Sequence, residues 1–137
     1  DISWENLIKD YTEIVETARM AENYEQAFSY QQQKIALYEN NNALNHPDLL
    51  YAYCLIATIC LELEDYDLAL SYQNHAFGLT EQLISPDPSD MMCAYANMYH
   101  IYQHYGDDNL ADAYQEKAQQ AHKDLQKKWA DDAKNNP

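Results

Sequence analysis

The sequence predicts an all-α fold in which three similar helical hairpins stack into a solenoid. The first observation is an internal repeat: a shift of 42 residues aligns the chain with itself twice, so that Ala27, Ala69 and Ala111 superpose. A fixed period of this length is typical of architectures in which each repeat is one supersecondary unit stacked on the next. The second observation is composition, because only 2 Gly and 4 Pro in 137 residues disfavour a turn-rich β fold.

The first and second repeats are each predicted to contain two helices. In the second repeat Leu49, Tyr53 and Ile56 recur at three- and four-residue spacing, which indicates one buried helical face. This helix is expected to begin at Pro47-Asp48, because proline suits a first turn and an acidic side chain suits the N-terminal end of the helix dipole. The four helices predicted here are 4–20, 24–40, 47–64 and 66–85.

The third repeat predicts a further pair of helices. Its first helix is expected to use Ser89 as N-cap and to reach Tyr105, with Gly106 forming the turn. The second begins near Asp108 and continues beyond Trp129, which makes it the longest helix of the chain. The sequence therefore predicts six helices in three hairpins and no strand.

Charge narrows the class of partner. The net charge is −15, and no Lys or Arg occurs between Lys34 and Lys117. Nucleic acids and anionic lipids both need clustered basic side chains, so neither is expected to bind. The simplest interpretation of the charge is solubility, and the more specific one is a preference for a basic or neutral protein or peptide.

The cysteines and the hydropathy pattern bear on location. Cys54, Cys60 and Cys93 form an odd set without metal-binding spacing, which favours reduced thiols and a cytoplasmic location. No apolar run approaches the roughly 18 residues that a membrane-spanning helix needs. No signal-peptide pattern occurs at the start of the sequence.

A pattern in the second repeat resembles a known family. Tyr66, Ala69 and Tyr72, which follow a helix with Tyr53 and Ala57, resemble the tetratricopeptide repeat. The common form has a period of 34 residues, whereas the 42-residue period found here is similar to that of kinesin light chains and related bacterial proteins. The resemblance implies a right-handed α-solenoid.

The resemblance also implies a domain organisation. The repeats are expected at about 4–45, 46–87 and 88–130 of a single domain, 1–137. Because the sequence does not begin with Met, the domain is expected to be a segment of a longer protein. Asp108 replaces the tyrosine found at Tyr24 and Tyr66, so the third repeat diverges most. We expect its long last helix to act as a cap on the end of the solenoid.

The family resemblance implies a ligand-binding surface on the concave face, which is lined by the first helix of each hairpin. Asn97 matches an asparagine that holds the backbone of a bound peptide in kinesin light chains. The residues expected to bind a peptide or helix on this face are Thr12, Glu13, Glu16, Arg19, Tyr51, Leu55, Thr58, Glu62, Cys93, Asn97, His100 and His104.

Two binding modes known in the family fit this surface poorly. Chaperone cofactors hold a terminal carboxylate with Lys, Asn and Arg, but Thr12, Glu16, Leu55 and Cys93 occupy four of the matching places, and only Asn97 is retained. Kinesin light chains bind tryptophan-acidic motifs on a basic groove, whereas this face is poor in Lys and Arg. The predicted function is a non-enzymatic protein–protein interaction module with another specificity.

Chemical motifs are few. His100 and His104 lie one helical turn apart and are the candidates for a metal pair. Cys93 would lie about 10 Å along the helix from His100, too far to complete a four-ligand structural site. No catalytic triad, phosphate loop or metalloprotease motif occurs, so we predict no enzyme, no cofactor and no metal.

Two other functions remain open. A regulatory sensor would bind a short peptide or small ligand and change the curvature of the solenoid. A structural oligomerisation segment, possible as a homodimer, would use Trp4 or Trp129 as interface anchors.

Overall fold

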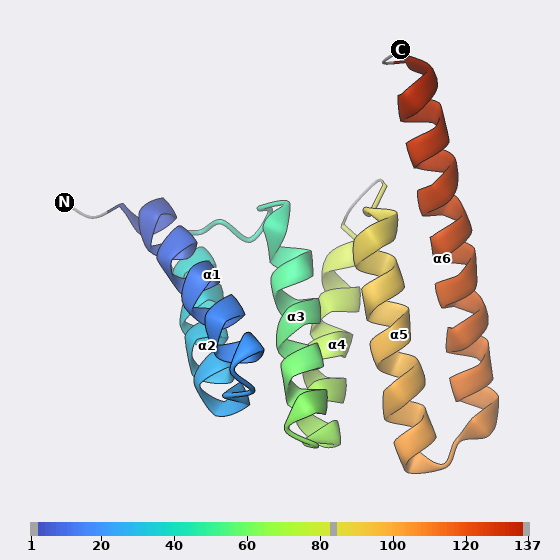
Figure 1. Cartoon of the computed structure of the whole chain (residues 1–137), viewed down its shortest axis with the longest axis horizontal. Helices are drawn as coiled ribbons and strands as arrows, with labels where there is room; N and C mark the ends of the chain where they lie inside the picture. The colour runs from blue at the N-terminus through green and yellow to red at the C-terminus, as the bar shows by residue number, and fades with distance from the viewer. Residues whose placement is uncertain (1–2, 83–84, 136–137) are drawn as a thin grey trace.

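The computed structural model describes residues 3–82 and 85–135, and within them it contains six helices and no strand. The helices pair as three hairpins that stand side by side (Figure 1). Their bounds are α1 Trp4–Met20, α2 Tyr24–Asn40, α3 Asp48–Glu62, α4 Tyr66–Thr80, α5 Pro88–Tyr105 and α6 Asp108–Asn135. The predicted all-α class is confirmed. No helix of the described residues is long and apolar enough to cross a membrane.

Each hairpin starts its second helix in the same way. Asn23, Asp65 and Asp107 occupy equivalent repeat positions, and each side chain accepts a hydrogen bond from a backbone N–H three residues later. Such a cap satisfies one of the four free N–H groups at a helix start. The 42-residue period therefore fixes the beginning of α2, α4 and α6.

The turn within each hairpin is also repeated. Glu22, Glu64 and Gly106 have positive φ values of 57°, 60° and 77°. In every case the next residue donates its N–H back to a carbonyl in the last turn of the preceding helix, as in Asp65 N to Cys60 O at 2.9 Å. This is the Schellman arrangement, which ends a helix and reverses the chain.

Two predicted boundaries are wrong. Asp87, and not Ser89, caps α5: its carboxylate accepts the Ser89 N–H at 2.8 Å. Pro88 takes the first helical position because its fixed φ already suits a helix and its missing N–H needs no partner. The other difference is α4, which ends at Thr80 instead of continuing to the proline at 86.

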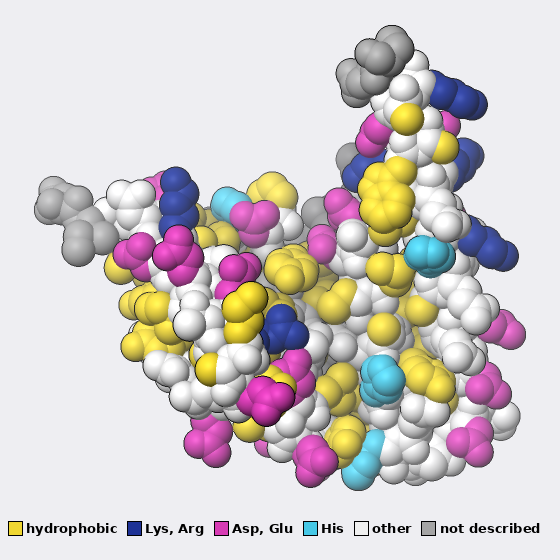
Figure 2. Space-filling model, in the orientation of Figure 1, with side chains coloured by type: hydrophobic (Ala, Val, Ile, Leu, Met, Phe, Trp, Pro, Cys, Tyr) yellow, Lys and Arg dark blue, Asp and Glu magenta, His cyan; other side chains and the backbone are white. Residues whose placement is uncertain are grey.

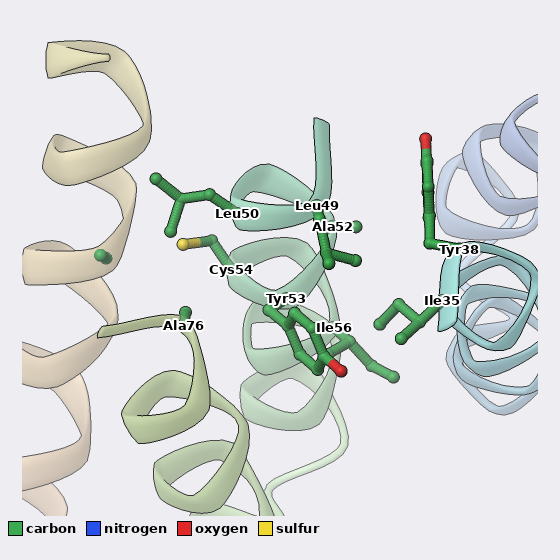
Figure 3. Close-up of a cluster of buried hydrophobic side chains, with 10 residues drawn as sticks. Ile35, Tyr38, Leu49, Leu50, Ala52, Tyr53, Cys54, Ile56 and Ala76 are labelled. Carbon is green, nitrogen blue, oxygen red and sulfur yellow. The ribbon is translucent and has the colours of Figure 1, made fainter. Parts of the chain in front are cut away.

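The core is centred on α3, most of which is enclosed by the neighbouring hairpins. Ile35 and Tyr38 of α2 lie on one side of α3, and Ala76 of α4 lies on the other (Figure 3). The repeated alanines Ala27 and Ala69 are fully buried, which lets the paired helices approach closely. The middle hairpin therefore holds the solenoid together.

Candidate functional site

A groove of about 720 Å³ lies between α3 and α5. Half of the predicted binding residues line it: Thr58, Glu62, Cys93, Asn97, His100 and His104. The sequence prediction missed Leu61 and Tyr66, which also line the groove. Figure 2 shows histidine side chains over the region of α5.

The floor of the groove is a polar network around Asn97. Asn97 is only 4% exposed. Its Nδ2 donates to Cys54 O at 3.1 Å and to Gln73 Oε1 at 2.9 Å, and the Thr58 hydroxyl lies 3.1 Å from its Oδ1. The amide is thus satisfied within the protein, and the role of peptide-backbone holder implied by the resemblance does not match this geometry.

One wall of the groove is aromatic. The rings of Tyr66 and His104 stack with centroids 3.6 Å apart and planes 4° from parallel. This contact joins the start of α4 to the end of α5. Tyr66 could have been found from the repeat, because it follows the capping residue Asp65 and therefore begins the second helix of its hairpin.

His100 and His104 are both exposed at the open side of the groove. Within residues 3–82 and 85–135, no three potential metal ligands lie close enough to hold an ion. Both histidines line the groove and offer polar ring nitrogens to it.

The thiols at this site are held in the protonated form. Burial raises the pKa of Cys93 above its ordinary value and raises the pKa of Cys54 to about 12. Since the thiolate is the nucleophile in cysteine chemistry, neither side chain is set up for covalent catalysis at neutral pH.

The remaining predicted residues lie elsewhere, so they do not form one continuous surface. A separate cavity of about 60 Å³ between the first hairpin and α3 is lined by Thr12, Glu16, Arg19, Tyr51 and Leu55. Glu13 faces a third hollow, on the outer side of α1. Leu55 belongs to the core and packs with Val15 and Ala18 of α1.

The small cavity contains a buried lysine that the sequence prediction left out. Lys34 is 8% exposed. Burial lowers its pKa, and the carboxylates of Asp48 and Glu16 oppose that shift. Gln31 lines the same cavity; its Nε2 donates to Ala52 O at 3.0 Å, while its enclosed Oε1 has no partner among the described residues.

One ion pair links the small cavity to the groove. Arg19 donates to Glu62 Oε1 at 2.9 Å, which joins α1 to α3. Glu62 is the acid of the groove lining, so the pair leaves the groove itself without a free positive charge among the described residues. A site that binds carboxylates presents Arg or Lys side chains to the ligand, and the described lining of this groove has none.

The two tryptophans differ in their surroundings. Trp4 packs edge-on against Tyr38, with ring centroids 5.8 Å apart, so it is part of the core of its own hairpin. Trp129 is 59% exposed on α6. Of the two predicted interface anchors, Trp129 is therefore the more available.

Comparison with known families agrees with this geometry. The family model described as tetratricopeptide repeat matches residues 10–82, which is more than half of the chain. No curated protein and no solved structure shows significant similarity to the chain. The matched segment covers most of the first two hairpins, and the third repeats their caps and turns. The chain therefore belongs to the tetratricopeptide repeat family.

Proposed function

We propose that the chain is a non-enzymatic interaction module that binds a neutral or basic peptide or helix in the groove between α3 and α5. Repeats of this family mediate protein–protein interactions. The observation that carries the proposal is the groove itself, about 720 Å³ in volume, with no Lys or Arg among its described lining residues. Its acid, Glu62, is paired with Arg19 at the edge of the groove.

The shape of the groove supports a polymeric ligand. It lies open along two neighbouring helices and offers exposed polar groups, His100 and Gln103, beside the aromatic wall of Tyr66. A segment laid across a helical surface can place successive side chains on such groups, as in helix-in-groove recognition. The groove is preformed by packed helices, so binding costs little reorganisation.

Charge supports a basic or neutral ligand. The whole chain carries −15, and the stretch from 35 to 116, which contains the groove lining, has no Lys or Arg. An acidic ligand would meet this field without a cation to pair with, whereas Lys or Arg would be attracted. The three free cysteines support a cytoplasmic location for this interaction.

The proposal is tested with three synthetic peptides that differ only in charge: one basic, one neutral and one acidic. Fluorescence anisotropy should show the basic peptide binding tightest and the acidic peptide not at all. Higher salt should weaken the basic complex, because screening reduces attraction between exposed charges.

A pair of histidine variants locates the site. His100→Ala removes an exposed groove side chain and should weaken binding about five-fold, the equivalent of roughly 1 kcal/mol. His122→Ala removes an exposed histidine of α6 outside the groove and should leave the affinity unchanged. Equal losses in the two variants, or preference for the acidic peptide, would refute the assignment.

A further inference from the structure

The outer face of the third hairpin carries a second groove, of about 520 Å³, between α5 and α6. It lies at the end of the solenoid, and no other described helix covers it (Figure 1). Its lining includes Ala96 of α5 and Gln115 and Ala118 of α6.

The same repeat positions are buried in the hairpin before it. Cys54 and Ala76, which the 42-residue shift aligns with Ala96 and Ala118, are both fully buried. They share a core cluster with Ala94 of α5, the first helix of the following hairpin. The open groove therefore has the small side chains that elsewhere accept an incoming helix.

A repeated glutamine gives a second, polar sign of a missing helix. Gln31 and Gln73 are fully buried, and each bonds to the hairpin that follows: Gln31 donates to Ala52 O, and Gln73 accepts from Asn97 Nδ2. Gln115 is the third member of this set, but it is exposed in the groove. Gln31 and Gln73, in contrast, each bond to the first helix of the hairpin that follows.

The opposite end of the solenoid offers the complementary surface. The outer side of α1 has a hollow of about 330 Å³ lined by Glu13 and Thr17. The 42-residue shift aligns Thr17 with Ile59, which packs on Val15 and Ala18 of the preceding hairpin. The chain thus carries both halves of its own repeating interface, one at each end.

We propose that the α5–α6 groove binds α1 of a second copy of this chain, in the place that the first helix of a following hairpin would take. Glu13 of the second copy then occupies the position of Asn97. His100 and Gln115 take the positions of Thr58 and Gln73, which contact Asn97 within the chain.

Charge favours this pairing. The described lining of the groove contains Lys123 and no acidic side chain. The hollow on the outer side of α1 is lined by the exposed Glu13 and has no Lys or Arg in its described lining. Opposite charges across an interface set its register and suppress wrong pairings.

The geometry of such a contact predicts how assembly grows. Two different faces meet, so each added copy leaves a free groove at one end and a free α1 at the other. Association is therefore expected to increase continuously with concentration instead of stopping at a dimer. The net charge of −15 on each copy opposes it, so the contact is expected to be weak at low salt.

The test is the solution mass of the 137-residue chain, measured by sedimentation over two orders of magnitude in concentration at moderate salt. The average mass should rise steadily. Ala118→Arg should block the groove, and Thr17→Arg should block α1, so each variant alone should be monomeric. A mixture of the two should form a one-to-one dimer and nothing larger, because each supplies the face that the other lacks.

Controls separate this contact from unfolding and from the peptide site. Ala113→Arg, at an exposed position of α6 outside the groove, should associate like the parent chain. Lys123→Glu is a surface change that replaces the arginine variants if either of them fails to fold. It should weaken association. Neither Ala118 nor Thr17 lines the α3–α5 groove, so both variants should keep peptide binding.

Two results would overturn the proposal. One is a parent chain that stays monomeric at every concentration, which would leave the groove to a helix of another sequence. The other is a mixture of Ala118→Arg and Thr17→Arg that stays monomeric while the parent associates, because the contact would then use other faces.

Discussion

Asn97 carries the polar contacts that join the second and third hairpins. Its amide bonds to Cys54 of α3 and Gln73 of α4, beside Thr58, and its side chain is buried at the floor of the α3–α5 groove. Buried polar groups that lose their partners keep the full cost of desolvation, about 1–3 kcal/mol for each group. Asn97 therefore belongs to the stability of the fold more than to ligand binding.

Replacing Asn97 with Ala should lower the free energy of unfolding by about 2–4 kcal/mol, because Gln73 Oε1 and Cys54 O lose their donor and a small cavity is left. Urea denaturation followed by circular dichroism measures this loss. His100→Ala, an exposed position on the same helix, should change the stability by no more than about 0.5 kcal/mol. Similar values for the two variants would contradict the structural role.

The place of Asn97 could not be read from the sequence, and the reason is physical. The repeat identifies Glu13, Leu55 and Asn97 as equivalent, but it does not say how far each is covered. Glu13 is exposed because no described helix packs outside α1, while Leu55 and Asn97 are buried beneath their neighbours. Exposure in a solenoid depends on the position of the repeat in the stack as well as on the position within it.

At the scale of elements, the turns show how one backbone geometry tolerates different residues. Glu22, Glu64 and Gly106 all lie in the left-handed region at the same repeat position. Only Gly adopts this region without a steric penalty from Cβ. The first two hairpins therefore retain a small amount of backbone strain that the third avoids.

The two glycines of the chain should respond to alanine with opposite signs. Gly106→Ala should destabilise the protein by about 1 kcal/mol, since φ at this position is 77°. Gly78→Ala, inside α4, should stabilise it by about 0.5–1 kcal/mol, because Ala is the better helix former. A Cβ at either position would meet no atom within 4 Å beyond the adjacent backbone, so the comparison isolates backbone conformation. Melting temperatures that move in the same direction would contradict it.

Element boundaries were predictable where local chemistry sets them. The caps Asn23 and Asp65 and the turn at Gly106 follow from short-range preferences, and the predicted bounds of α1 and α2 agree with the structure. The start of α5 was predicted wrongly because Ser89 and Asp87 are both good caps, and the choice depends on Pro88 taking the first helical position.

At the scale of the whole molecule, six of the twelve residues predicted from the sequence line the α3–α5 groove, and the sequence did not predict how the twelve are grouped. The prediction treated twelve residues as one concave surface, whereas packing divides them among the α3–α5 groove, the small cavity near Lys34 and the outer side of α1. That division depends on the angles and spacing between hairpins, which arise from contacts across the stack. The 42-residue period does not determine these angles and spacings.

The excess of acidic groups should make the whole molecule more stable at mildly acidic pH. Asp90, at the start of α5, shows the effect most clearly: burial and the carboxylates of Asp87 and Asp48 raise its pKa to about 6, although Lys128 opposes the shift. An unfolded Asp titrates near pH 3.9. Between these values the folded chain binds more protons than the unfolded chain, so the free energy of unfolding rises as the pH falls from 7.5 to 5.

Substituting Asp90 with Asn removes this titration. The variant should be more stable than the parent at pH 7.5, by about 1 kcal/mol after allowance for solvent screening, and the difference should shrink at pH 5. Urea unfolding at the two pH values measures it. Asp112→Asn is the control, because it removes one charge from the molecule at an exposed position of α6. Its pH dependence should stay close to that of the parent. A constant difference between Asp90→Asn and the parent would mean that Asp90 titrates like an ordinary surface carboxylate, and that the pH dependence arises from the net charge of −15 as a whole.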